Sequence, residues 1–320
     1  MDGILVGVFG TEAEPKAALL TSLGKKSEAE GMVIYHRTEA GRRISLLDDQ
    51  QFPQRIQGYA RVASLSDQAL FMFPRSGRLG AADGELAVLL EGFSLRGTIE
   101  VVEGSVPPES VRAALKGTAV GGYPIEERNL QSTVLDPSWL APRGDSPKGT
   151  LVYVDRAFTV KGIGTVALGF VLSGKVSVHD ELRPMPGKEG LRADVKSIQI
   201  NDEDYDSAGT GIRVGLSLKG VEPADLDSTH WLDDGSFRTS NTLNLAFAKS
   251  PFYKPPVIDR EMHIQLPGEM LAATISQGGQ PGTLSAKLQS DVPCWEGMRA
   301  CLIDLNAKNL RVAGGCTCRF

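Results

Sequence analysis

The stretch from Asp155 to Lys175 reads DRAFTVKGIGTVALGFVLSGK and predicts a β-hairpin. Gly162 and Gly164 lie on either side of Ile163, and alternating apolar residues flank them. Glycine adopts the positive φ of a tight turn at no steric cost. We therefore expect the tip of a hairpin at this glycine pair, with one strand on each side.

The hairpin belongs to a run of short strands separated by glycine turns, a pattern typical of a small β-barrel. We assign this barrel to residues 150–233, in which 174–176 and 180–183 fit a second hairpin. Further strands are expected at 195–199, 208–209 and 211–221. Residues 236–320 repeat the pattern and predict a second all-β domain. Its strands are expected at 243–248, 262–266, 271–275, 282–288, 298–304 and 310–314.

Residues 1–136 alternate apolar strand segments with helical ones. Strands separated by helices indicate a mostly parallel sheet with crossover connections. The strands are expected at 4–9, 32–36, 43–47, 68–73 and 97–102. The helices are expected at 14–23, 59–64, 83–93 and 108–115. Proline, glycine and polar residues dominate 137–149, which predicts a linker between this domain and the first barrel.

The order and spacing of the pieces in 150–233 resemble domain II of translation factors of the elongation factor Tu (EF-Tu) type, most closely the SelB type. The resemblance implies a multidomain protein that combines α/β and all-β units. A P-loop GTPase-like α/β domain would come first, followed by two EF-Tu-type β-barrels, domains II and III. In that family domain II holds the aminoacylated 3′ end of tRNA.

The resemblance also implies an amino-acid pocket in domain II. Asp155, Arg156 and Arg213 match an Asp-Arg pair and a further arginine that the family uses there. The planar fork of an arginine can hold a carboxylate, a phosphate or a selenolate-like anion. The structural alternative is that Asp155 and Arg156 merely pair with each other at the end of a strand.

A GTPase domain carries Gly-x-x-x-x-Gly-Lys-[Ser/Thr] after its first strand, because that loop holds the phosphates and Mg²⁺. Residues 7–14 read GVFGTEAE instead. Gly7 and Gly10 remain, but Glu12 stands at the second glycine and Ala13 at the lysine. Glu14 replaces the hydroxyl residue. Two carboxylates near a triphosphate would repel it, so the phosphate loop is expected to be degenerate.

The other nucleotide-binding motifs are also changed. Residues 46–51, LLDDQQ, keep the aspartate of Asp-x-x-Gly without its glycine, and 103–106, EGSV, replace the guanine-reading Asn-Lys-x-Asp. Residues 24–31 are too few for a mobile first switch, and Lys16 is a poor substitute for the missing lysine. We therefore expect a domain that does not hydrolyse GTP. Weak nucleotide binding through backbone amides remains open, as does an unrelated α/β domain fused to these barrels.

Composition narrows the partners and the compartment. The chain has 320 residues and a net charge of −5, which argues against sequence-independent coating of nucleic acid, and we expect no DNA partner. The sequence has no apolar run of about 18 residues and no signal-peptide pattern at its start. We expect a cytoplasmic protein without a membrane partner.

Four cysteines are weak candidates for a metal site: Cys294, Cys301, Cys316 and Cys318. Structural zinc prefers paired cysteines separated by about two to four residues, whereas Cys316 and Cys318 are separated by one. Buried reduced thiols are the alternative. We expect no metal and no cofactor, and the binding of GTP and Mg²⁺ is doubtful.

These observations predict a protein like a translation elongation factor that binds and does not catalyse. We expect an aminoacyl-tRNA or another structured RNA as the partner, held by domain II with help from domain III. Action on the ribosome is left open. Two alternatives remain. One is an active GTP-dependent elongation factor with an atypical phosphate loop, and the other is a protein-binding scaffold with no RNA ligand.

Overall fold

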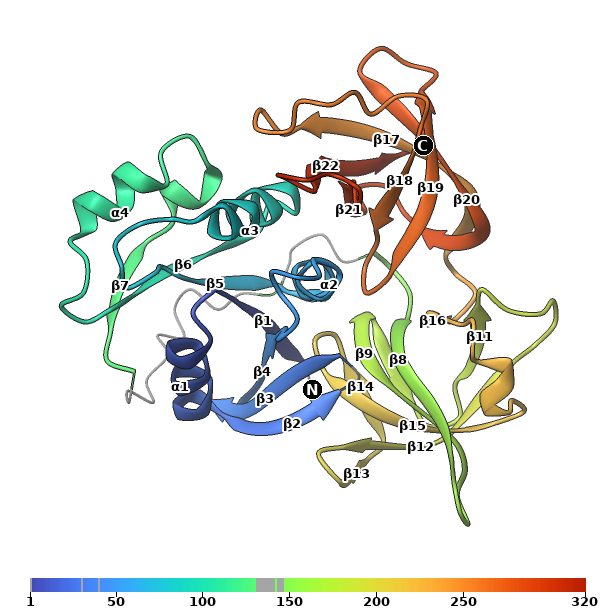
Figure 1. Ribbon diagram of the computed structural model, residues 1–320. Coiled ribbons are helices and arrows are strands. Elements are labelled where there is room, and N and C mark those ends of the chain that lie inside the picture. Colours follow the sequence, from blue (N-terminus) through green and yellow to red (C-terminus); the bar gives the residue numbers. More distant parts are fainter. Residues whose placement is uncertain (1, 30, 40, 131–141, 143–146) are drawn as a thin grey trace.

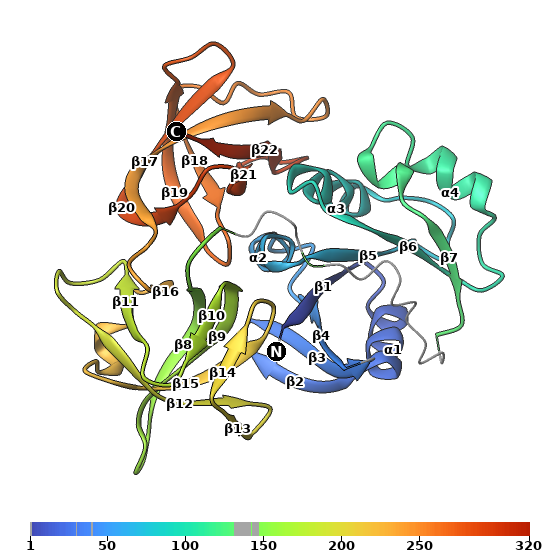
Figure 2. The ribbon, with the colours of Figure 1, turned by 180° about the vertical axis from the view of Figure 1, so that it is seen from behind.

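The computed structural model describes residues 2–29, 31–39, 41–130, 142 and 147–320. An α/β unit, here domain I, is followed by two β-barrel units, domains II and III, seen from opposite sides in Figures 1 and 2. The predicted multidomain fold, which combines an α/β domain with all-β domains, is confirmed. Most of the predicted linker at 137–149 lies outside the described residues, as does the predicted end of domain I at 136.

Domain I is built on a seven-stranded sheet in the order β2-β3-β4-β1-β5-β6-β7. Its strands are β1 (Gly3–Phe9), β2 (Lys25–Ala29), β3 (Met32–Glu39), β4 (Arg42–Asp48), β5 (Gln68–Met72), β6 (Arg96–Val102) and β7 (Ile125–Arg128). Strands β4, β1, β5, β6 and β7 run parallel, whereas β2 and β3 are antiparallel to their neighbours. The mostly parallel sheet predicted from the sequence is therefore confirmed.

Helices cover both faces of this sheet (Figure 1). They are α1 (Ala13–Leu23), α2 (Gln57–Leu65), α3 (Ala81–Gly92) and α4 (Pro108–Ala114). Because side chains alternate along a strand, β1 contributes to two cores. Ile4 and Val6 pack with residues of α1, while Leu5 and Phe9 pack with residues of α2 and α3. All of β1 is buried, as expected for a central parallel strand.

Two strands of domain I were not predicted. Strand β2 has the sequence KKSEA and β7 has the sequence IEER, and neither shows the run of apolar residues that marks a buried strand. Both form at the edges of the sheet, where a strand has only one partner. The short segment at 24–31, from which a reduced first switch was inferred, is thus mostly an edge strand paired with β3.

Domain II is a barrel with strand order β11-β16-β8-β9-β15-β12-β13, in which β11 also pairs with β12. The strands are β8 (Leu151–Val160), β9 (Gly164–Ser173), β11 (Glu181–Met185), β12 (Ala193–Ile200), β13 (Glu203–Tyr205), β15 (Arg213–Lys219) and β16 (Trp231–Asp233). The predicted β8–β9 hairpin is confirmed, and the φ values of Gly162 and Gly164 are 84° and 102°.

The second predicted hairpin of domain II is wrong. Strand β10 (Lys175–Ser177) pairs with β14 (Ser207–Gly209), and β11 pairs with β12 and β16. The two segments are close in sequence and both apolar enough to form strands. Sequence spacing does not reveal that β10 belongs to a two-stranded sheet with β14, whereas β11 belongs to the seven-stranded sheet of the barrel.

Domain III is a closed barrel in the order β17-β20-β19-β18-β21-β22. Its strands are β17 (Arg238–Lys249), β18 (Arg260–Gln265), β19 (Met270–Gln277), β20 (Thr283–Cys294), β21 (Arg299–Ile303) and β22 (Val312–Arg319). All six predicted strands of this domain form, but β17, β20 and β22 each extend five or six residues beyond the expected limits at one end.

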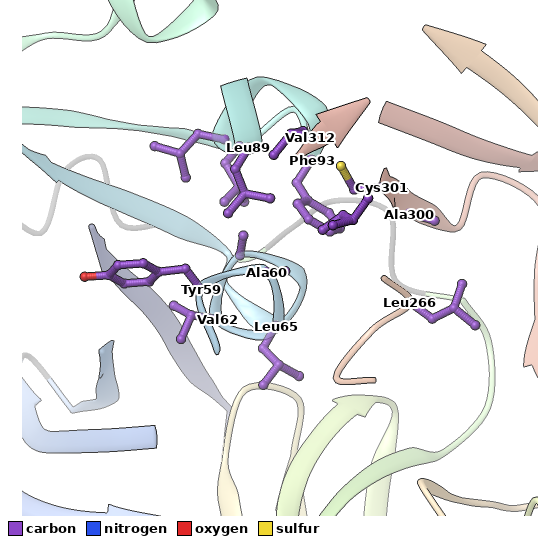
Figure 3. Packing of buried hydrophobic residues seen from close by; sticks show 14 of the residues in the cluster. Tyr59, Ala60, Val62, Leu65, Leu89, Phe93, Leu266, Ala300, Cys301 and Val312 are labelled. Carbon is purple, nitrogen blue, oxygen red and sulfur yellow. The ribbon is translucent and has the colours of Figure 1, made fainter. Parts of the chain in front are cut away.

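Domains I and III share one hydrophobic core (Figure 3). Helices α2 and α3 supply residues such as Ala60 and Leu89 on one side, and domain III supplies Leu266 and Val312 on the other. Ser64 of α2 accepts hydrogen bonds from Gln265 Nε2 at 3.3 Å and from the backbone N–H of Gly268 at 3.0 Å. Helix α2 is therefore packed directly against the second barrel.

Domain II contacts both neighbours. The backbone N–H of Gly3 donates to the carbonyl of Thr210 at 2.8 Å, and Arg43 Nη2 donates to the hydroxyl of Tyr205 at 2.5 Å. Trp231 Nε1 donates to the carbonyl of Pro267 in domain III at 2.8 Å. Within the described ranges, no helix is both long and apolar enough to cross a membrane.

Candidate functional site

The loop between β1 and α1, which has the position of a GTPase phosphate loop, makes several contacts within the chain. The Thr11 hydroxyl donates to Asp83 Oδ1 at 2.5 Å. The Glu12 carboxylate accepts from the backbone N–H of Arg75 at 3.3 Å and lies 3.5 Å from its Nε. Ala13 is the first residue of α1. The loop is thus tied to the β5–α3 connection and to the start of α3.

The two glycines that were compared with the phosphate-loop motif contribute to packing. Gly7 lies within β1, between Leu47 of β4 and Ala69 of β5. A Cβ added at Gly7 would stand 2.5 Å from the Phe9 ring. One added at Gly10 would stand 2.9 Å from Met72 Cβ. Close packing against Phe9 and Met72 therefore accounts for both glycines.

A buried polar cluster lies behind this loop, around Lys16. Its ammonium is 2.7 Å from Asp48 Oδ1, donates to the Tyr59 hydroxyl at 2.6 Å and donates to the carbonyl of Asp49 at 3.2 Å. The Tyr59 hydroxyl lies 3.1 Å from Asp48 Oδ1 and 3.2 Å from the carbonyl oxygen of Gly10. Lys16 is 6% exposed, Asp48 3% and Tyr59 0%. An ammonium has three N–H donors, and all three find acceptors here.

Burial dominates the electrostatics of this cluster. It raises the pKa of Asp48, and the nearby Lys16 charge opposes that rise. Burial, with the Asp48 charge as a second cause, holds the pKa of Tyr59 well above its ordinary value. Asp48, which was compared with the aspartate of Asp-x-x-Gly, is therefore paired with a lysine of the same chain.

The three residues proposed for the domain II pocket divide into a buried pair and a separate arginine. Arg213 Nη1 donates to Asp155 Oδ2 at 2.6 Å, and the two side chains are 11% and 1% exposed. Strand β8 has an irregularity between Val154 and Arg156, which places Asp155 at a bulge. Arg156 is exposed, with its guanidinium 5.6 Å from the Phe158 ring centroid. The alternative in which Asp155 pairs only with Arg156 is wrong.

A cleft of about 670 Å³ separates domain I from domain II and is lined by Arg213. Strands β2 and β3 supply Lys25, Lys26 and His36 on the domain I side. The domain II side is partly apolar, with Phe158, Val160, Ile163, Val166 and Leu168. The two lysines do not stand out in the sequence, because a polar edge strand carries no periodic signal. The sequence hints at these lysines only through their adjacency within the segment 24–31, where a first switch would lie.

His36 lines the cleft and is uncharged at neutral pH. Its Nδ1 is 3.1 Å from the Ser45 hydroxyl. Burial first, and then the charges of Arg213 and Arg43, lower the pKa of His36 to about 4. Its ring can therefore offer a neutral hydrogen-bonding group to a ligand at physiological pH.

The lowered pKa makes the protein less stable in mild acid. Because the unfolded chain takes up a proton at His36 near pH 6.5 and the folded chain only near pH 4, the free energy of unfolding should fall as the pH drops through this window. Replacing His36 with glutamine should make that fall shallower. Denaturant unfolding at pH 7, 6 and 5 measures it. Equal pH dependence in the two proteins would contradict the assignment.

Arg156 lines a second cavity, of about 400 Å³, where the three domains meet. Arg61 of α2, His230 of domain II and Glu269 of domain III also line it. His230 Nδ1 is 3.6 Å from Glu269 Oε2, and burial lowers the pKa of His230. The structure therefore places Arg156 and Arg213 in different cavities, which the sequence did not distinguish.

The four cysteines are buried in the barrel of domain III. Burial raises the pKa of Cys301 and of Cys318 to about 12, so both thiols stay protonated at neutral pH. Among the residues whose placement is described, no three or more His, Cys, Asp or Glu side chains form a group that could hold a metal ion. In this structure the thiols pack as small apolar groups.

Comparison with known proteins agrees with this architecture. Residues 164–232 match the family "Elongation factor Tu domain 2". An uncharacterized protein of Methanocaldococcus jannaschii is 29% identical over 98% of this chain and 99% of its own length. The selenocysteine-specific elongation factor of the same organism is 47% identical over 73 residues, which are 23% of this chain and 15% of that factor.

The three-domain arrangement also has a solved counterpart. The crystal structure of a bacterial selenocysteine-specific elongation factor, EF-Sec, superposes with a TM-score of 0.83 and 17% identity. The superposition covers 99% of this chain and 58% of that factor, so the chain spans little more than half of its length. Residues 164–232 are thus similar to domain 2 of elongation factor Tu, and the whole chain has the fold of a selenocysteine-specific elongation factor over the part that superposes. In sequence, the similarity to a selenocysteine-specific elongation factor is confined to those 73 residues.

Proposed function

We propose that the cleft between domains I and II binds the 3′ end of an aminoacylated tRNA, or of a related structured RNA, without guanine nucleotide. The observation that carries the proposal is the composition of the cleft, which joins lysines of β2 to an apolar wall in domain II. Its volume of about 670 Å³ is within the range of small-ligand sites. A tRNA partner also implies a cytoplasmic location.

The two walls suit the two parts of a terminal nucleotide. Phe158 and Ile163 offer an apolar surface on which a base can stack or rest, and Ile163 is 45% exposed. Lys25 and Lys26 are exposed on the opposite side and can approach phosphates. A local basic wall is compatible with the net charge of −5, because RNA affinity depends on where the charges lie.

The proposal that no nucleotide is needed rests on the cluster around Lys16. The carboxylate that would help to hold Mg²⁺ is paired with an ammonium at 2.7 Å, and Glu12 lies in the loop where phosphates would be bound. A nucleotide would have to displace the Asp48–Lys16 pair and approach two carboxylates. Both steps cost free energy, since a buried charge that loses its partner is strongly unfavourable.

RNA binding should depend on the two lysines of β2. The Lys25→Ala/Lys26→Ala variant should bind total tRNA at least tenfold more weakly at about 0.1 M salt, because two phosphate contacts are lost. For a single strand each contact adds roughly 0.7 to the slope of log affinity against log salt, so that slope should become shallower by roughly 1.4. Filter binding across a salt series measures both quantities.

A matched control removes two exposed lysines elsewhere. Lys116 comes just after helix α4, which lies apart from strand β2 (Figure 1), and Lys308 lies in domain III. Lys116→Ala/Lys308→Ala changes the net charge equally and should leave the salt slope unchanged. Equal weakening by both variants would contradict a local site. Absence of salt-dependent tRNA retention by the unaltered protein would favour a scaffold that binds proteins.

GTP should not bind the unaltered protein. Isothermal titration with GTP, with and without Mg²⁺, should give no heat of binding at micromolar concentrations, because the pair behind the loop would have to be broken. Nanomolar to low-micromolar affinity would contradict this expectation and support the alternative of an active GTP-dependent factor.

A further inference from the structure

The hydroxyl of Tyr59 connects helix α2 to the loop that follows β1. It accepts a hydrogen bond from Lys16 Nζ at 2.6 Å and lies within 3.2 Å of Asp48 Oδ1 and of the Gly10 carbonyl oxygen. The Tyr59 ring also packs on Phe9, with ring centroids 5.2 Å apart. One end of α2 is therefore held by groups from β1, α1 and β4.

The other end of the same helix is attached to domain III. The Ser64 hydroxyl accepts from Gln265 and from the backbone of Gly268, and it donates to the carbonyl of Arg61 at 2.8 Å. Ala60 and Leu65 of α2 belong to the core that domain III completes (Figure 3). A nine-residue helix thus links the cluster around Lys16 to the second barrel.

In nucleotide-dependent switch proteins, the segment after the Asp-x-x-Gly aspartate is ordered by the γ-phosphate and its Mg²⁺, and it is released when they leave. Here the corresponding helix makes its polar contact with a lysine of the chain itself. We infer that Lys16 is a positioning residue whose ammonium keeps α2 ordered permanently and without a ligand. Because domain III packs on α2, the same ammonium also fixes the position of domain III.

This assignment is independent of the proposed RNA site. It explains why Lys16 is buried with every N–H donor satisfied. A covalently attached cation cannot dissociate, so the equilibrium between ordered and released states has no ligand to shift it. We expect a single domain arrangement in the presence and absence of nucleotide.

Hydrogen exchange followed by mass spectrometry on the full chain tests the assignment. Lys16→Met should accelerate amide exchange at least tenfold in α2 and in residues 265–269, with little change in the β8–β9 hairpin of domain II. Tyr59→Phe breaks the link to α2 but leaves the Lys16–Asp48 pair, so it should act in the same places with a smaller effect. If Lys16→Met does not fold, the Tyr59→Phe variant alone provides the test.

The control is Glu14→Gln, on the same helix as Lys16 and with a side chain that is 95% exposed. It should leave exchange in α2 unchanged. A purely structural role for Lys16 would accelerate exchange evenly across β1, α1 and α3, and that result would overturn the inference. Unchanged exchange of α2 in both Lys16→Met and Tyr59→Phe would overturn it as well.

Discussion

Replacing Glu85 with glutamine should lower the free energy of unfolding by about 3–5 kcal/mol, because it leaves a largely buried arginine without its counter-charge. Glu85 lies on α3 and accepts from the backbone N–H of Arg311 at 2.7 Å and from its guanidinium Nε at 3.1 Å. The two side chains are 5% and 17% exposed. Arg311, the residue before β22, also donates to the carbonyl of Pro53 at 3.0 Å, so it joins domain III to two parts of domain I.

Guanidinium chloride unfolding measures the loss, and an exposed ion pair supplies the comparison. Glu296 and Arg319 form a similar contact at 2.9 Å, but their side chains are 53% and 57% exposed. Glu296→Gln should cost less than about 1 kcal/mol. A double variant, Glu85→Leu/Arg311→Met, should recover part of the loss because no unpaired charge remains. Equal costs at the buried and the exposed pair would contradict this account of the interface.

The fold was predictable because apolar periodicity and glycine turns mark most of its elements. The strands at 4–9 and 68–73 and the helix at 83–93 emerged close to their observed limits. Pairing between strands was less predictable. Strand β10 pairs with β14, some 30 residues away, and nothing in the local pattern encodes that choice.

The candidate site was only partly predictable. The resemblance identified Asp155 and Arg213, but the bulge that turns Asp155 inward is a backbone feature without a sequence signal. The sequence makes Lys16 a poor substitute for the phosphate-loop lysine, but its position also carries a sign of burial. Residues 16, 19, 20 and 23 share one helical face, and the other three are apolar. A lysine on the buried face of a helix must find hydrogen-bond acceptors inside the fold. The residue spacing predicts that Lys16 lies on this face, but it does not predict which groups accept its hydrogen bonds.

Asp155→Asn and Arg213→Met should each cost about 3–5 kcal/mol of unfolding free energy, since either change leaves the partner in a poorly hydrated site. Arg213 is also held over the Phe170 ring, 5.3 Å from its centroid, so it has little freedom to reach water. The double variant should cost less than the sum of the two single ones, because the two side chains are in direct contact. Denaturant unfolding of the unaltered protein, the two single variants and the double variant gives the coupling free energy of the pair in a double-mutant cycle.

The same four proteins separate a structural role for this pair from a role in binding. Arg213 lines the cleft and can approach an anionic ligand, whereas Asp155 is 1% exposed and does not line the cleft. If the cleft binds RNA, Arg213→Met should weaken tRNA binding about tenfold or more, as expected for a lost charged contact. Asp155→Asn removes a negative charge and keeps the arginine, so it should not weaken binding under conditions where the variant remains folded. Parallel losses in both variants would mean that the pair only supports the barrel, and the RNA contact would then have to come from the lysines of β2.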